Sequence, residues 1–231
     1  EYAKLTKARN LLVTIYGNYF LLYSEYLNDD KAALLHAQKA FYFSNKFNNS
    51  QKDDKKEIHN QFAILSNLGV AHKNIGQADS ALYYYQKMVE FVPKHSILSH
   101  PFYSAVCKSH ISEVLLLQEN TSEAIEYATA AVTAAQESGI PNAIHVSLLN
   151  LADGQKQSGD LKLAKKTALE IKPSELSSKD KARLYKLLAD IEEAFGLSNN
   201  ALSYYKSYNA VKDSLHEMKT KNNFIRQDAD Y

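Results

Sequence analysis

The sequence predicts an all-α protein built from about five copies of one helical hairpin. Apolar residues recur at three- and four-residue steps along most of the chain, the period of a helix that is buried on one face. The 231 residues include only 7 Gly and 4 Pro, too few for the many turns of a β-sandwich or barrel. A helical protein needs only a few such breaks.

The hairpin is defined by a turn residue that is followed, five positions later, by an alanine. The five pairs are Asn28 and Ala33, Gly76 and Ala81, Glu119 and Ala124, Gly159 and Ala164, and Gly196 and Ala201. They recur at spacings typical of helical-hairpin arrays. We predict hairpins over residues 3–47, 51–95, 101–138, 142–172 and 178–215, within one domain that spans residues 1–231.

The helices follow from the residues around each turn. Beside Gly76, helical steps join Leu65, Leu68 and His72 before the turn, and Ala81, Tyr85 and Met88 after it. The prolines fall between hairpins, where a helix must stop or start: Pro93, Pro101, Pro141 and Pro173. The first helices of the first two hairpins are predicted to be long, over residues 3–26 and 51–75, and the mixed charges of K52-D-D-K-K56 suit a solvated helix start.

Gly69 lies in the middle of a predicted helix, where glycine costs about 1 kcal/mol relative to alanine. We interpret it as the point where the second helix of the same hairpin crosses closely. Ser112, Ala152 and Ala189 occupy the same place in the third, fourth and fifth copies. A column of small residues is what a close crossing requires.

Leu65-x2-Leu68-Gly69-x2-His72, followed by Ala81-x3-Tyr85 and Pro93, resembles the tetratricopeptide repeat (TPR) signature, with Leu65 and His72 in place of the usual Trp and Tyr. The fifth copy resembles it at Tyr185, Leu188, Ala189, Gly196, Ala201 and Tyr205, and the first keeps Ala33, Ala37 and Ala40. The resemblance implies a right-handed α-solenoid whose concave face binds a protein or peptide.

The resemblance also places the concave groove on the first helix of each hairpin. The candidate groove residues are Asn18, Leu22 and Tyr26; Ser66, Val70, Lys73 and Asn74; Ser109, Glu113 and Leu117; Leu149, Asp153 and Lys156; and Lys186 and Asp190. Glu113, Asp153 and Asp190 share one column, which could form an acidic groove end for a ligand that carries Lys or Arg. Alternatively, they are solvated acids that Lys156 and Lys186 neutralise. The Lys and Asn pair with which some TPR proteins hold a C-terminal carboxylate is absent.

Several function classes are disfavoured by composition and motifs. The net charge of +1 argues against direct nucleic-acid binding. No catalytic or dinucleotide motif occurs, so we expect no enzyme and no cofactor. Cys107-x2-His110 lacks the three or four convergent ligands of a metal site and suggests a buried thiol beside a surface imidazole. No apolar run is long enough to span a membrane, so we expect no membrane contact by this segment.

The C-terminal segment has a heptad seam. Tyr208, Val211, Leu215, Met218, Asn222 and Ile225 follow one another at alternating steps of three and four residues. We predict an extension of the last helix over residues 216–231. It could cap the final hairpin, or form a coiled coil that makes a homodimer.

Residues 201–215, A-L-S-Y-Y-K-S-Y-N-A-V-K-D-S-L, are similar to the end of the repeat region in Bacteroidetes-type membrane-anchored regulators. That resemblance implies a periplasmic sensing part, anchored through flanking sequence, and the chain's start at Glu1 rather than Met suits a piece of a longer protein. A cytoplasmic location is the alternative. We therefore expect a protein- or peptide-binding module that serves signalling or transcription regulation, or alternatively a scaffold or dimerisation domain that acts through the C-terminal helix.

Overall fold

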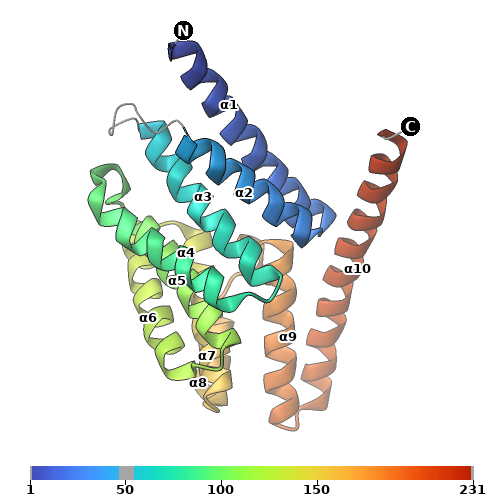
Figure 1. Cartoon of the computed structure of the whole chain (residues 1–231). Coiled ribbons are helices and arrows are strands. Elements are labelled where there is room, and N and C mark those ends of the chain that lie inside the picture. The colour runs from blue at the N-terminus through green and yellow to red at the C-terminus, as the bar shows by residue number, and fades with distance from the viewer. Residues whose placement is uncertain (1, 47–54, 230–231) are drawn as a thin grey trace. The chain divides into compact units, whose positions relative to one another are not determined.

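The structure, a computed structural model, describes residues 2–46 and 55–229, with the side chains of residues 8–45, 55–218 and 220–221. All regular elements in these ranges are helical (Figure 1), so the predicted all-α helical-repeat fold is confirmed. The chain forms two compact units, one of Glu1–Ser99 together with the chain from Asn222 to its end, and one of His100–Lys221, and each is described by itself. A single domain over residues 1–231 stays a prediction.

The first unit contains two helical hairpins. The first pairs α1 (Tyr2–Leu21), which continues into the π-helix η1 (Leu22–Leu27), with α2 (Asp30–Lys46). The second pairs α3 (Lys55–Asn74) with α4 (Ala78–Phe91), and two short 3-10 helices follow, η2 (Val92–Lys94) and η3 (Ser96–Leu98). Because α3 contacts both α1 and α2, the two hairpins stack. The stacking buries a core of Val13, Phe20, Ala33, Ala37, Ala40, Ile64, Leu68 and Ala71.

The second unit contains the other three hairpins. They pair α5 (Pro101–Leu117) with α6 (Thr121–Ser138), α7 (Pro141–Gln157) with α8 (Leu161–Leu169), and α9 (Ser178–Ala194) with α10 (Ser198–Ala229), and η4 (Pro173–Glu175) precedes α9. Helix α7 contacts α5, α6, α8 and α9. One buried core of this unit joins α7, α8 and α9, with Tyr204 of α10 packed against it.

The helix bounds follow the predicted hairpins closely. Pro101 and Pro141 are the first residues of α5 and α7, a position where the missing N–H is not needed. Helix α10 runs without a break to Ala229, and the predicted extension covers residues 216–231. The predicted helix start at K52-D-D-K-K56 lies outside the described residues except for Lys55 and Lys56.

The turn and alanine pairs that defined the repeat are confirmed in all five copies. Each turn residue has a left-handed backbone conformation, with φ of 52° at Asn28, 81° at Gly76, 60° at Glu119, 90° at Gly159 and 73° at Gly196. Glycine adopts this conformation without steric cost, whereas Asn and Glu adopt it only at a steric cost. The alanine that follows is buried in every hairpin: Ala33, Ala81, Ala124, Ala164 and Ala201.

The close crossing within a hairpin is confirmed at Gly69 and Ser112. A Cβ atom on Gly69 of α3 would lie 2.6 Å from Cδ1 and 2.7 Å from Cζ of Tyr85 in α4. Tyr85 is fully buried, so its ring has no solvent to move into. In the third hairpin, the buried Ser112 hydroxyl donates a hydrogen bond of 2.8 Å to the carbonyl oxygen of Ala124. Small residues let the paired helices approach at these points.

Alanine substitutions at two mid-helix glycines test this crossing. A Cβ on Gly17 in α1 meets nothing within 4 Å, in contrast to one on Gly69. Gly17→Ala and Gly69→Ala gain the same helix propensity, so the difference between their unfolding free energies measures the clash with Tyr85. We expect Gly69→Ala to be the less stable of the two by about 1–3 kcal/mol in urea denaturation. Equal unfolding free energies would contradict the crossing.

Candidate functional site

The candidate groove residues of the first hairpin lie on an exposed apolar face of α1 and η1. Leu22 is 40% exposed, Tyr26 is 58% exposed, and Asn18 is exposed one turn earlier. Three further large apolar side chains lie on the same face, Leu11, Ile15 and Tyr19, and each is at least 36% exposed. We call this surface the α1 face: Leu11, Ile15, Asn18, Tyr19, Leu22 and Tyr26. The chain has no charged residue from position 10 to position 24, so the face is uncharged over four turns.

The candidate residues of the second hairpin are more enclosed. Ser66, Val70 and Lys73 of α3 are half-buried, and Val70 packs against the core of the first unit. Asn74 is exposed, but its Nδ2 donates a hydrogen bond of 2.9 Å to Oδ1 of Asp30 at the start of α2. This amide therefore helps to stack the two hairpins.

Two residues that we predicted for the groove belong to the interior, so these predictions are wrong. Leu149 is fully buried in the core between α7, α8 and α9. Ser109 is buried, its hydroxyl lies 2.9 Å from that of Ser147, and its carbonyl oxygen accepts a hydrogen bond from Nδ2 of Asn150. Ser109 lies on the side of α5 that faces α7, whereas Leu149 lies on the side of α7 that packs against α8 and α9.

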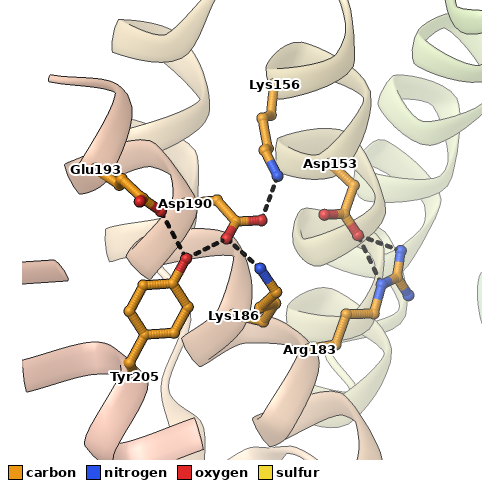
Figure 2. Close-up of polar contacts among 7 residues, drawn as sticks. All are labelled: Asp153, Lys156, Arg183, Lys186, Asp190, Glu193 and Tyr205. Carbon is orange, nitrogen blue, oxygen red and sulfur yellow. Dashed lines mark hydrogen bonds and ion pairs between the residues drawn. The ribbon is translucent and has the colours of Figure 1, made fainter. Parts of the chain in front are cut away.

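Arg183 of α9 joins three first helices of the second unit. Its Nη2 and Nε lie 2.5 and 2.6 Å from Oδ2 of Asp153 on α7, and its Nη1 lies 3.6 Å from Oε1 of Glu113 on α5. Figure 2 shows the pair with Asp153. One planar guanidinium therefore contacts both carboxylates, which a lysine ammonium could not reach in the same way.

A second cluster forms around Asp190 of α9 (Figure 2). The Nζ of Lys156 on α7 lies 2.6 Å from Oδ2 of Asp190, and Lys186 donates a hydrogen bond to Oδ1. The hydroxyl of Tyr205 on α10 lies 3.0 Å from Oδ1 of Asp190 and 2.8 Å from Oε2 of Glu193. Its single proton serves one carboxylate at a time. The cluster connects α7, α9 and α10.

The two aspartates have opposite pKa shifts. Burial raises the pKa of Asp153, and attraction to Arg183 offsets only part of this effect. Burial also raises the pKa of Asp190, but hydrogen bonds from Lys156, Lys186 and Tyr205 outweigh burial and bring its pKa below the ordinary value. The hydrogen bonds to Glu193 and Asp190 raise the pKa of Tyr205 to about 12, so this hydroxyl keeps its proton at neutral pH.

These pairs decide between the two interpretations of the acidic column. Glu113, Asp153 and Asp190 are each only partly exposed and each faces a cation. Lys156 and Lys186 neutralise Asp190 as the second interpretation expected, whereas Arg183 serves the other two carboxylates. An acidic groove end is therefore contradicted in the second unit. Leu117, the last candidate on α5, is an exposed apolar side chain.

The described side chains offer few reactive groups. Burial raises the pKa of the Cys107 thiol to about 12, so the thiol stays protonated at neutral pH. His110, one turn later on α5, is half-buried. Among the side chains that the structure describes, no three His, Cys, Asp or Glu residues gather as a metal set. None of the described helices has the length and apolar character of a membrane span.

Solved structures that resemble this chain are TPR-like. It is similar to the nearly identical TPR-like repeats of a kinesin light chain-like protein from Podosopora anserina, with a TM-score of 0.53 and 14% identity over 93% of this chain and 97% of that chain. It is also similar to BtubC (BKLC) from P. vanneervenii, with a TM-score of 0.60 and 11% identity over 94% of this chain and 91% of that chain. The chain has a TPR-like fold. No protein-family model matches it, and no curated protein matches its sequence.

The ion-pair clusters of this TPR-like chain were only partly foreseen from sequence. Arg183 was missed, although it precedes Lys186 and Asp190 by three- and four-residue steps on the same face of α9. Its partners lie on α5 and α7, far away along the chain. The predicted groove also lacked three residues of the α1 face, Leu11, Ile15 and Tyr19. They recur with the same period as the core residues, so the sequence alone does not separate them from the core.

Substitutions at Arg183 test whether one guanidinium holds three helices of the TPR-like array. The pair with Asp153 is intermediate between exposed and buried, so we expect Arg183→Gln to lower the unfolding free energy by roughly 1–3 kcal/mol. Arg183→Lys should recover only part of this loss, because the ammonium cannot contact both carboxylates. Lys162→Gln, on the exposed face of α8, is the control and should stay within about 0.5 kcal/mol of the unsubstituted chain. Full recovery by lysine in urea denaturation would contradict the bridging role.

Proposed function

We propose that this chain is a protein- or peptide-binding module whose ligand lies on the first helices of the hairpins. TPR-like repeats are generally protein-interaction modules, and the similar proteins are typically non-enzymatic scaffolds. The observation that carries the proposal is the α1 face, where five large apolar side chains are 36–60% exposed on consecutive turns. Contiguous exposed apolar surface of this kind is a feature of interaction sites.

The α1 face favours a ligand with an apolar surface. Its length, from Leu11 to Tyr26, corresponds to about 22 Å along a helix, enough to contact several turns of a helical peptide. Tyr19 and Tyr26 contribute large, rigid contact area together with a hydroxyl. Such residues are frequent among those that dominate binding energy.

The first helices of the second unit, taken by themselves, offer specificity more than affinity. Lys156 and Lys186 are the partly exposed cations of this surface, but both already bind Asp190. A ligand group that binds either ammonium must replace part of an existing ion pair. The net gain in free energy is therefore small, while a wrongly placed charge is penalised.

Replacing the apolar side chains of the α1 face tests this proposal. A peptide selected from a random library for binding to the chain should lose about tenfold or more in affinity to the Leu22→Ser/Tyr26→Ser variant. Leu35→Ser/Tyr42→Ser is the matched control, because both side chains are similarly exposed but lie on α2, the second helix. Isothermal titration calorimetry measures the affinities, and thermal unfolding verifies the fold. An equal loss in both variants, or none in either, would refute the assignment of the ligand to the α1 face.

We further propose that the module is the sensing part of a larger signalling or transcription-regulatory protein. The support is the resemblance of residues 201–215 to the end of the repeat region in membrane-anchored regulators. A periplasmic location, with an anchor in flanking sequence, belongs to the same proposal, and a cytoplasmic location is the alternative. The link from binding to output would be the Asp190 cluster, because Tyr205 joins α9 to the long helix α10.

Hydrogen exchange tests this link. We expect ligand binding to change amide protection in residues 206–221 of α10, and Tyr205→Phe to reduce that change, since phenylalanine lacks the hydroxyl that reaches Asp190 and Glu193. Tyr208→Phe is the control, as its hydroxyl takes no part in the cluster. Unchanged protection in this segment when ligand saturates the unsubstituted chain would rule out transmission through α10.

A scaffold that acts through the C-terminal helix is the second candidate function. The length of α10 favours it, since α10 has 32 residues whereas its hairpin partner α9 has 17. A helix of that length presents more surface than one hairpin can cover.

A further inference from the structure

Helix α10 is anchored in its hairpin mainly through its first turns. Ala201 is buried, Tyr204 packs against the core of α7, α8 and α9, and Tyr205 hydrogen-bonds to Asp190 and Glu193. At 1.5 Å per residue, α10 is about 48 Å long and α9 about 26 Å. About half of α10 therefore extends past the length of its hairpin partner.

The apolar seam of α10 continues beyond these anchors. Tyr208, Val211 and Leu215 are half-buried, and Met218, one step further, is 47% exposed. The sequence continues the seam with Asn222 and Ile225, whose side chains lie outside the described residues.

The polar contacts of this half of α10 stay within the helix. Over residues 206–221, the hydroxyls of Ser207 and Thr220 donate to backbone carbonyls one turn earlier. The Nζ of Lys212 lies 5.3 Å from the ring centroid of Tyr208, also in α10. The described polar side chains of residues 206–221 therefore do not bind this segment to another helix.

The charges of this segment are sorted around the seam. In the heptad that places Tyr208 at position a, Lys212 and Lys221 take the flanking positions e and g, and both are exposed. The exposed acids Asp213 and Glu217 take positions f and c on the opposite side. The surface beside the seam is thus basic, although the whole chain has a net charge of only +1.

A second copy of the chain is a poor partner for this surface. The sequence places Lys219 and Arg226 at the next e positions, with Asp228 at the last g position. An antiparallel pair of α10 helices would oppose e to e, basic against basic. A parallel pair would oppose Lys221 to Arg226. Like charges at these positions are unfavourable, because e and g residues set partner choice in coiled coils.

We propose that the stretch of α10 from Tyr208 to Lys221 docks an amphipathic helix of another protein whose apolar seam is flanked by Glu or Asp. Tyr208, Val211, Leu215 and Met218 would pack against the partner's seam, and Lys212 and Lys221 would face its carboxylates. Charge complementarity selects this partner over a second copy. The proposal deepens the second candidate function and does not depend on the α1 face.

Two synthetic helices of 24 residues test the docking. Both have leucine at a and d, and their e and g positions are all Glu in one and all Lys in the other. We expect the 231-residue chain to bind the Glu-flanked helix about tenfold more tightly or better in fluorescence anisotropy. The difference should shrink in 0.5 M salt, because salt screens exposed charges. Equal affinities, or no binding of either helix, would overturn the proposal.

Variants connect the result to the seam. Lys212→Glu/Lys219→Glu/Lys221→Glu should reverse the preference toward the Lys-flanked helix, and an unfolded protein cannot show such a gain in binding. Met218→Asp should weaken binding about tenfold, whereas Thr220→Asp on the opposite side should not. Leu22→Ser/Tyr26→Ser should leave binding unchanged, which separates this surface from the α1 face. Sedimentation velocity that shows dimers at micromolar concentration, dissolved by Met218→Asp, would make a second copy the occupant and overturn the proposal.

Discussion

The repeat depends on one steric constraint, the close approach of two helices at a point where one of them has almost no side chain. In the second hairpin, Gly69 leaves room for the ring of Tyr85, so the largest fully buried side chain of the described core lies where a Cβ would have been. In the third, Ser112 both fits the crossing and binds the backbone of Ala124. Because this approach brings the two apolar stripes together, neighbouring hairpins can then stack on the paired helices.

The two units use their first helices differently. In the first unit, α1 presents an uncharged surface with large exposed apolar side chains. In the second, Arg183 of α9 has partners on α5 and α7, and Asp190 of α9 has partners on α7, α9 and α10. The apolar surface offers binding energy through desolvation, whereas the charged surface is already satisfied by its own ion pairs. A ligand gains most from the first kind of surface, and the second holds the helices in place.

The helices, their turns and the small residues at the crossings could be predicted from the sequence because each depends on nearby residues. The turn at Glu119 is instructive, since this residue has the same left-handed conformation as the glycines of three other turns. Glu119 could be identified as a turn residue because it stands five positions before the buried Ala124. The groove was harder to predict, because an apolar residue on a first helix can face either the ligand or the neighbouring helix. Leu149 faces the core while Leu22 is exposed, although both follow the same helical spacing of apolar residues in a first helix.

The sequence by itself determined that this chain is a helical repeat, where each hairpin turns, and which small residues allow the helices to cross. These features follow from backbone conformation and from side-chain period, both of which act over a few residues. Only the tertiary structure decided that Arg183 serves two carboxylates, that Tyr205 reaches Asp190, and that the α1 face stays exposed. Such contacts join residues that are distant along the chain, and their geometry exists only once the helices have packed.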